Sequence, residues 1–306
     1  MKKFTLYILT AFGLMGLATS CNDFGDVNND PMNLNPGVVD YKMEFTQVEA
    51  QICGSDWDVW RNGCIYTANM IQHTASVDWA YGVFYTWNDQ YSGAYWGGFY
   101  SGGRAAIRNI IDVMNNWEGD PAYTNEYQMC RILKAYMFQN MTDLYGDVPY
   151  SEAGQGYSTN PIPYPKYDTQ EAIYDDLLKE LDEAQAALST SAGNTIGAAD
   201  VIYGGDAAKW KKFANSLMLR VAMRLTKVAP DKAKTWVAKA VSNGLFVSND
   251  DNAIVRHTNG SPSDDSAEPY GKVFSSLDTQ AFYISETFIN ILQDDPRLPL
   301  IATVCT

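Results

Sequence analysis

The sequence has few of the residues and patterns on which most catalytic and metal sites depend. Its two histidines, His73 and His257, lie at no recognisable spacing from a nucleophile. The patterns H-E-x-x-H, G-x-S-x-G and G-x-G-x-x-G and the phosphate-binding loop are absent. The 36 acidic residues offer many carboxylate pairs, so their number alone gives no support for a glycosidase. We therefore predict a protein that is not an enzyme and needs no cofactor or metal.

Cysteines are also few. None of the five forms a C-x-x-C pair or has a histidine beside it, so neither a zinc site nor a disulfide framework is predicted. Buried free thiols are the favoured interpretation for those other than Cys21, and a Cys53–Cys64 bridge stays open as an alternative. These four are Cys53, Cys64, Cys130 and Cys305.

Basic residues are scarce relative to acidic ones. Lys and Arg total 22 against 36 Asp and Glu, a formal net charge of −14. Removing residues 1–20, which hold two lysines and no acid, changes the balance to 20 − 36 = −16. Such a surface repels nucleic acid and anionic lipid headgroups, and no basic cluster offsets it. A neutral ligand, or a protein partner with a matching basic patch, is the better expectation.

The N-terminus has the layout of a bacterial lipoprotein signal. Lys2 and Lys3 precede the uncharged run FTLYILTAFGLMGLA, which is too short to span a membrane comfortably. Small residues then lead directly to Cys21, which predicts cleavage before that residue and a lipid anchor on it. The alternative is ordinary signal cleavage with Cys21 a bystander. No later segment is long and apolar enough to span a membrane.

Residues 21–37 are rich in Asp, Asn, Pro and Gly and predict an extended tether. Asp26, Asn28 and Asp30 have the spacing that opens a calcium loop. Pro31 then stands where glycine is needed and Gly37 where the closing glutamate belongs, so we reject a calcium site here.

From about residue 38 the apolar residues recur at helical spacing. Residues 95–117 place Trp96, Tyr100, Ile107, Ile111 and Met114 near one face. Three further helices are predicted to start at Asp120, at an Asp168–Glu171 capping box and at Asp206, and a fourth follows Pro230 directly. Their expected buried faces are Cys130, Leu133, Met137, Met141, Leu144; Ile173, Leu177, Leu181, Ala184, Leu188; Trp210, Phe213, Leu217, Val221, Leu225, Val228; and Trp236, Val237, Ala240, Val241.

The last two of these helices are joined so closely that they must form an antiparallel hairpin. NAIVRH, residues 252–257, is the best candidate for a short strand. Residues 146–167 form a long loop with four prolines and four tyrosines, which is typical of a functional loop or an interface. We predict an all-α fold of tetratricopeptide-like helix hairpins forming an α-superhelix with long irregular loops. The repeat consensus itself is absent.

At this point several segments carry a family resemblance. RILKAYMFQNMTDLYGDVPYSEA resembles the signature helix of the SusD/RagB family, in which the pattern R-A-Y-x-Y-x-x-L-x-x-x-Y-G-D-V-P ends a tetratricopeptide-like helix. PIPYPKYDTQEAIYDDLLKELDEA, DAAKWKKFANSLMLRVAMRL and DPRLPLIA resemble later family elements, and residues 1–37 look like the family's signal and tether. Within the family the chain is most similar to the starch-binding, outer-membrane-associated branch.

The resemblance implies a non-catalytic, lipid-anchored glycan-binding protein on the cell surface. Such a protein would bind an oligosaccharide or polysaccharide and deliver it to a TonB-dependent, SusC-like outer-membrane transporter. A peptide ligand, or a helical-repeat interaction scaffold without glycan contact, is the alternative. The family is longer and this chain stops at Thr306, so the resemblance implies a C-terminally truncated protein. The expected organisation is a signal (1–20), a tether (21–37) and a helical domain (38–306).

The stretch DWAYGVFYTWNDQYSGAYWGGFY, residues 78–100, holds ten aromatic residues. Trp96, Phe99 and Tyr100 lie on its helical side and are expected in the core. The earlier rings stand among amides, carboxylates and glycines, a composition that suits sugar binding, because aromatic faces stack on the C–H faces of a sugar ring. The alternative is that these rings pack under the loop. The predicted ligand-binding residues are Trp79, Tyr81, Trp87 and Tyr91 for stacking, and Asn88 and Asp89 for hydroxyl groups.

Other polar residues near the family motif are expected to be structural. Tyr145, Gly146, Asp147 and Pro149 should end a helix and turn the chain. Arg131 and Asp143 are expected to form a packed or solvated pair without a catalytic role. In the long loop, Tyr157, Tyr164 and Tyr167 either face the transporter or are simply exposed.

Overall fold

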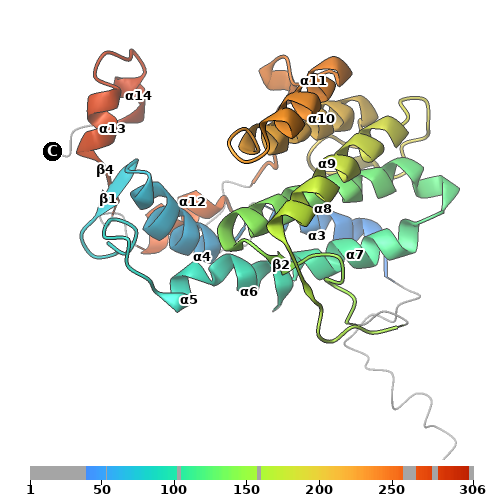
Figure 1. Cartoon of the computed structure of the whole chain (residues 1–306), viewed down its shortest axis with the longest axis horizontal. Coiled ribbons are helices and arrows are strands. Elements are labelled where there is room, and N and C mark those ends of the chain that lie inside the picture. The colour runs from blue at the N-terminus through green and yellow to red at the C-terminus, as the bar shows by residue number, and fades with distance from the viewer. Residues whose placement is uncertain are drawn as a thin grey trace, which may run out of the picture. The chain divides into compact units, whose positions relative to one another are not determined.

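The computed structural model describes residues 39–52, 54–101, 105–156, 160–257, 267–277 and 282–302 (Figure 1). The chain divides into two compact units, Met1–Asp40 and Tyr41–Thr306. The predicted signal, Cys21, the tether and the rejected calcium loop all lie outside the described residues, as do Cys53, Cys305 and Tyr157. Across the described residues, no helix has both the length and the apolar character needed to cross a membrane.

The second unit is built on long helices that pack against one another in chain order, as Figure 1 shows for α7 through α11. Helix α3 packs on α7, α7 on α8, α8 on α9, α9 on α10, and α10 on α11. This arrangement of successive hairpins confirms the predicted all-α, tetratricopeptide-like fold; we call it the helix array. Its members are α3 (Tyr41–Gln51), α7 (Ala106–Trp117), α8 (Thr124–Tyr145), α9 (Gln170–Ala187), α10 (Ala207–Arg224) and α11 (Pro230–Asn243).

Shorter elements connect and flank the array. They are α4 (Asp56–Asp58), the π-helix η2 (Val59–Ala68), α5 (Asp89–Ser92), α6 (Ala94–Tyr100), α12 (Pro269–Lys272), the π-helix η6 (Val273–Leu277), α13 (Glu286–Ile291), α14 (Leu298–Ile301) and the 3-10 turns η3 (Pro121–Tyr123), η4 (Gly197–Ala199) and η5 (Asn249–Asp251). Two antiparallel pairs complete the fold: β1 (Thr74–Ser76) with β4 (Phe282–Ile284), and β2 (Val148–Pro149) with β3 (Tyr167–Asp168). The predicted strand at 252–257 is wrong, since that segment is irregular.

Of the three residues predicted to cap helix starts, two do so and one does not. The Asp120 carboxylate accepts a hydrogen bond from the Ala122 N–H at 2.8 Å, in the 3-10 turn that leads into α8. Asp206 caps α10 as predicted. The predicted capping box at Asp168 is wrong, because the cap of α9 is Thr169. Asp168 instead accepts hydrogen bonds from the backbone N–H groups of residues 150 and 151, so it fixes the long loop rather than the helix.

Most of the residues predicted to face the core are buried, and the most exposed exceptions lie near helix ends. All five predicted residues of α9 are buried, and so are those of α8 and α10 apart from Leu144, Phe213 and Val228. Leu144 is 39% exposed in the last turn of α8. Val228 is 79% exposed because α10 ends at Arg224, before the helical period reaches it. On α11 only Ala240 of the predicted face is fully buried; Trp236 and Val237 are partly buried against the core, and Val241 is exposed.

Residues 94–117 form two helices instead of one. Helix α6 ends at Tyr100, and Ala105, with φ 34°, precedes α7. Phe99 is buried, and Trp96 and Tyr100 pack against the main core, as expected. The buried face of α7 is centred on Ala106, Ile107, Ile110 and Val113, so Ile111 and Met114 lie at its margin.

The family-motif residues have structural roles. The Tyr145 hydroxyl donates to the Ser92 carbonyl at 2.8 Å and accepts from the Trp96 N–H at 3.2 Å. Gly146 ends α8 with φ 75°, a conformation that favours glycine, and Asp147 accepts from the Gln170 N–H at 2.8 Å.

The predicted Arg131–Asp143 pair is wrong, because twelve residues of helix separate the two side chains along α8. Arg131 instead forms a bidentate ion pair with Glu180, both N–O distances being 2.9 Å, and also contacts Glu183. Asp143 pairs with Arg224.

A buried carboxyl pair ties α3 to the loop before α10. Glu49 is fully buried and accepts a hydrogen bond from the Val201 N–H at 2.7 Å. Its other neighbour is Asp200, which accepts from the Trp210 indole N–H and from the Gly205 N–H, each at 2.7 Å. Burial first, and then Asp200, raises the pKa of Glu49 to about 10, so its carboxyl group stays protonated at neutral pH.

Candidate functional site

The aromatic stretch of the sequence packs into a second, smaller hydrophobic cluster. We call the part built by residues 55–92, together with α12, η6 and β4, the aromatic region. Its buried centre is Val59, Trp60, Cys64, Ile65 and Tyr66 of η2 with Val273 of η6. Trp79, Tyr81, Tyr91 and Phe282 pack around this centre and are partly exposed. This cluster is separate from the main core of the helix array.

Trp60 is the centre of the ring contacts. Its ring lies 5.0 Å from Trp79 and 5.7 Å from Tyr91, both in edge-to-face geometry. Tyr91 in turn meets Trp79 at 5.8 Å and Tyr81 at 5.5 Å. Edge-to-face contacts of this kind stabilise ring pairs beyond their burial alone. Three of the four predicted stacking residues are therefore brought together here as a mutually supporting group.

Sequence reasoning missed the residues that carry this group. Trp57 meets Trp60 at 5.5 Å, and the Arg61 guanidinium lies 5.1 Å from the Trp57 ring and 5.8 Å from the Tyr91 ring. The signal was present in the sequence: Ser55 and Asp58 form a capping box, and two tryptophans three positions apart follow the cap.

Gly82 fixes the aromatic loop against η2. Its N–H donates to the Ile65 carbonyl at 3.1 Å. A Cβ at this position would lie 2.4 Å from the Ile65 carbonyl oxygen and 2.7 Å from that of Tyr66. Only glycine allows such a close approach of two backbones. The loop therefore leaves η2 at a defined point and presents the residues that follow.

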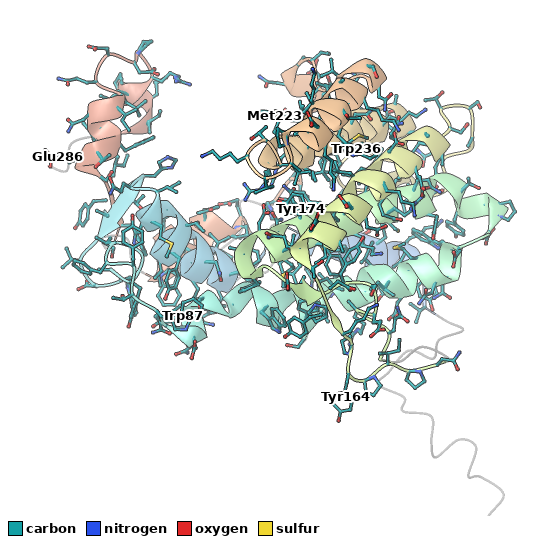
Figure 2. All side chains as sticks on the ribbon, in the orientation of Figure 1. Trp87, Tyr164, Tyr174, Met223, Trp236 and Glu286 are labelled. Carbon is teal, nitrogen blue, oxygen red and sulfur yellow. The ribbon has the colours of Figure 1, made fainter. Side chains whose placement is uncertain are left out.

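The residues that follow Gly82 in the loop form an exposed surface, which we call the aromatic tip. Phe84, Tyr85 and Trp87 are 70%, 66% and 75% exposed. Tyr85 has a φ of 54°, which is strained for a bulky residue, and its hydroxyl donates to the Met70 carbonyl at 3.1 Å. The Trp87 indole N–H donates to the Asp89 carboxylate. Trp87 projects from the segment before α5, as Figure 2 shows.

Asn88 and Asp89, the two polar residues predicted to bind ligand, form hydrogen bonds with groups close to them in the chain. The Asn88 side-chain oxygen caps α5 by accepting from the N–H groups of Gln90 and Tyr91, at 3.1 and 3.3 Å. Its amide N–H₂ group remains a donor. Asp89 is exposed and orients Trp87. Of the six predicted residues, Trp87 and Asp89 are thus exposed at the tip, Asn88 shapes it, and Trp79, Tyr81 and Tyr91 support it from beneath.

Other features of the described chain offer less for chemistry. Burial raises the pKa of the Cys64 thiol to about 11, so this free cysteine is a poor nucleophile. Cys130 is likewise free and buried, as the sequence favoured, and the free Cys64 thiol argues against a Cys53–Cys64 bridge. The His73 ring lies 4.7 Å from the Phe288 ring, tilted by 42°. The described residues contain no group of three or more His, Cys, Asp or Glu that could hold a metal ion.

The tyrosines of the long loop lie apart from this cluster. Tyr164 is 91% exposed, and Tyr167 stacks on Trp96 of α6 at 6.0 Å. The Tyr100 hydroxyl holds the same loop by donating to the Pro149 carbonyl at 2.5 Å. This loop is therefore fixed at β2 and β3 and presents a free ring at Tyr164 (Figure 2).

Comparison with known proteins gives one family and many structures. The profile of the SusD-like family described as "Starch-binding associating with outer membrane" matches residues 39–306. A chitin-binding protein is similar at 34% identity and TM-score 0.73, over 84% of this chain and 54% of that one. A SusD-like protein of Bacteroidetes AC2a is similar at 31% identity and TM-score 0.73, over 85% and 50%.

A chitin-binding SusD homologue from Flavobacterium johnsoniae is 27% identical with TM-score 0.67, over 84% of this chain and 53% of that one. The chain thus spans about half the length of each of these three proteins. No curated protein matches it.

Proposed function

The chain belongs to the SusD-like family, and from this membership we propose that it is a glycan-binding lipoprotein without catalytic activity. It captures oligosaccharide at the exposed tip of the aromatic region and delivers it to a TonB-dependent, SusC-like transporter. The family description names starch binding and the outer membrane, and two of the similar structures are of chitin-binding proteins. A neutral glycan also suits a chain with a net charge of −14.

The observation that carries this proposal is the exposed, oriented ring of Trp87. A sugar ring presents C–H groups on its faces and hydroxyl groups at its edges, so a flat ring bordered by polar groups can bind both. Trp87 is held by its hydrogen bond to Asp89, with the Asn88 amide beside it. The ring cluster beneath is packed edge to face, so little ordering remains to be done on binding. Phe84 and Tyr85 extend the platform.

The anchor and the partner rest on sequence and family. Cys21 follows a lipoprotein-type signal, and the family is associated with the outer membrane. A lipidated Cys21 would hold the protein at the cell surface beside its transporter. Metabolic labelling with a fatty-acid analogue tests this step: label is expected on the natural chain and absent from Cys21→Ser. An unlabelled natural chain would overturn the anchor.

Glycan binding is tested by affinity electrophoresis of the purified protein through gels containing soluble starch or glycol chitin. We expect one polysaccharide to retard the protein, and Trp87→Ala to abolish that retardation while circular dichroism shows an unchanged helical fold. Trp236→Ala, a tryptophan substitution on α11 of the array, is the matched control and should migrate like the natural protein. Retardation that survives Trp87→Ala would remove the aromatic tip as the site. A folded protein that neither gel retards would contradict a starch or chitin ligand and favour a peptide.

A further inference from the structure

Two adjoining cavities lie along the second half of α8, outside the aromatic cluster. One of about 260 Å³ is lined by residues of η2, α6, α8 and α12, among them Tyr95, Tyr136, Asn140 and Tyr270. The other, of about 400 Å³, lies where the last turn of α8 meets the start of α9 and the α10–α11 connection. Both are lined by Asp143, so they meet at that residue. We call the pair the α8 groove.

The α8 groove holds two apolar side chains that depart from the predicted core pattern. Leu144 lines the smaller cavity and Val228 the larger one. Helical periodicity predicts both to be buried, yet they are 39% and 79% exposed. Both side chains lie at a helix end or beyond it, where helix packing does not cover them, so the groove keeps apolar surface that a ligand can contact.

The polar side chains of the groove are held in place by one another. Asp143 accepts a hydrogen bond from the Tyr174 hydroxyl and lies 3.0 Å from Arg224 Nε (Figure 2 labels Tyr174). Burial first, and then Asp143, raises the pKa of Tyr174 to about 12, so this hydroxyl keeps its proton. Arg220 lies 5.6 Å from the Tyr136 ring and donates to the Asn140 side-chain oxygen at 3.4 Å. A ligand would meet donors and acceptors that are already oriented.

The charges of the groove balance. Asp143, Glu171 and Asp175 line it, and three cations, Arg220, Arg224 and Lys232, lie in or beside it. Lys232 contacts Asp175 at 2.5 Å, as Arg224 contacts Asp143. On a chain of net charge −14 such a neutral groove neither repels nor attracts an ion strongly. It suits a neutral ligand rich in hydroxyl groups.

From this arrangement we propose that the α8 groove is a second sugar-binding site, separate from the aromatic tip. Its tyrosine rings, Leu144 and Val228 meet the apolar faces of sugar units, and Asn140, Asp143 and Arg224 bond their hydroxyl groups. The two cavities together have the size of ordinary ligand sites. The identity of the ligand class rests on the proposed function, whereas the location rests on the groove itself. Two sites on one chain would increase the avidity for a long glycan beyond that of either alone.

The test is isothermal titration calorimetry of the purified protein with maltoheptaose and with chitohexaose. We expect two sugar-binding events per chain. Arg224→Ala and Asn140→Ala should each weaken one of them about tenfold, since each removes a hydrogen-bonding group that lines the site. Arg256→Ala, an exposed arginine outside the groove, is the matched control and should change neither. Leu144→Trp, which fills the smaller cavity without removing a polar group, should abolish the same event.

The outcomes separate this proposal from the proposed function. Loss of one event in the groove variants and of the other in Trp87→Ala is the expected result. A single event that Trp87→Ala abolishes and the groove variants leave unchanged overturns the second site while the proposed function stands. A single event lost only in the groove variants keeps the groove and removes the aromatic tip as the site. No binding of either sugar by the folded protein overturns both proposals.

Discussion

The helix array and the aromatic region are held together by different means. In the array each helix packs on its neighbour in sequence, and large side chains such as Trp210, Phe138 and Met137 are fully buried. In the aromatic region the rings meet edge to face, most remain partly exposed, and a guanidinium lies over two of them. The array gains its stability from burial. The aromatic region buries less of its ring surface and presents oriented rings to solvent.

The two regions meet at a few polar contacts. The Tyr145 hydroxyl at the end of α8 donates to the Ser92 carbonyl and accepts from the Trp96 N–H. Within the aromatic region, the Asn62 side chain of η2 donates to the same Ser92 carbonyl at 3.1 Å. The position of the aromatic loop is thus set from the last turn of an array helix. A change in the array should lower overall stability, whereas a change in the aromatic region should alter binding with less effect on stability.

The largest expected effect is Trp210→Ala in the array. Trp210 is fully buried, and its indole N–H is bonded to the buried Asp200. Its removal leaves a cavity and takes away one of the hydrogen bonds to the buried Asp200, so the free energy of unfolding should fall by about 3–5 kcal/mol in urea denaturation. A loss below about 1 kcal/mol would contradict the assignment of this tryptophan to the array core.

The pH dependence of stability should report on Glu49, with a large effect for each pH unit. The folded chain keeps a proton on Glu49 up to about pH 10, whereas the unfolded chain releases it near the ordinary value of 4.5. The folded state therefore binds one more proton between these values. As pH rises through that window, the free energy of unfolding should fall by up to about 1.4 kcal/mol per pH unit.

Glu49→Gln provides the matched control for this dependence. Glutamine keeps the acceptor for the Val201 N–H and the donor toward Asp200 but cannot ionise. The slope of stability against pH between 6 and 9 should be markedly shallower in this variant than in the natural chain. Equal slopes in the two proteins would show that Glu49 is not the group responsible.

Gly82→Ala should have an intermediate effect confined to the aromatic region. The new Cβ would lie 2.4 Å from a carbonyl oxygen of η2, so the loop must move. We expect roughly 1–3 kcal/mol of destabilisation and loss of polysaccharide retardation, with the helical circular dichroism signal retained. Gly97→Ala is the control, because a Cβ there meets open space. If both variants retain binding, the close approach at Gly82 does not position the tip.

Trp87→Ala should have the smallest effect on stability. The ring is 75% exposed, so its removal should change the free energy of unfolding by no more than about 0.5 kcal/mol. The same substitution should abolish binding at the tip. The contrast between Trp87→Ala and Trp210→Ala measures directly how far the two regions divide binding and stability. A loss above about 2 kcal/mol in Trp87→Ala would place this ring in the structural core instead.

Much of the array could be predicted because each of its helices buries one continuous face. The five apolar residues of α9 recur at steps of three and four, and all are buried. The predictions fail where a contact from outside the helix determines which residue caps it or which side chain is buried. Thr169 caps α9 because the carboxylate of the preceding residue is used by the loop at residues 150–151. Leu144 and Val228 lie at the end of a helix or beyond it, where the period no longer describes the packing.

The aromatic region could be predicted less well, because it depends on contacts between distant segments. The density of rings at 78–100 indicated a special surface, but not which rings support and which are exposed. That division comes from Trp60, which lies outside the stretch, and from the backbone approach at Gly82. The β1–β4 pairing joins two segments of three residues with no alternating pattern long enough to recognise.

The β1–β4 pairing also has a consequence for the order in which the protein folds. Thr74 pairs with Ile284, and the Ser285 hydroxyl donates to the Gln72 carbonyl across 213 residues of chain. Most contacts of the array join successive helices, so it can form largely hairpin by hairpin as the chain emerges, and α3 then gains its contact with the loop before α10. The ring contacts around Trp60 can form early, because all of them lie within residues 57–91. Val273 of η6 and Phe282 of β4 join this cluster only after all the array helices have been made.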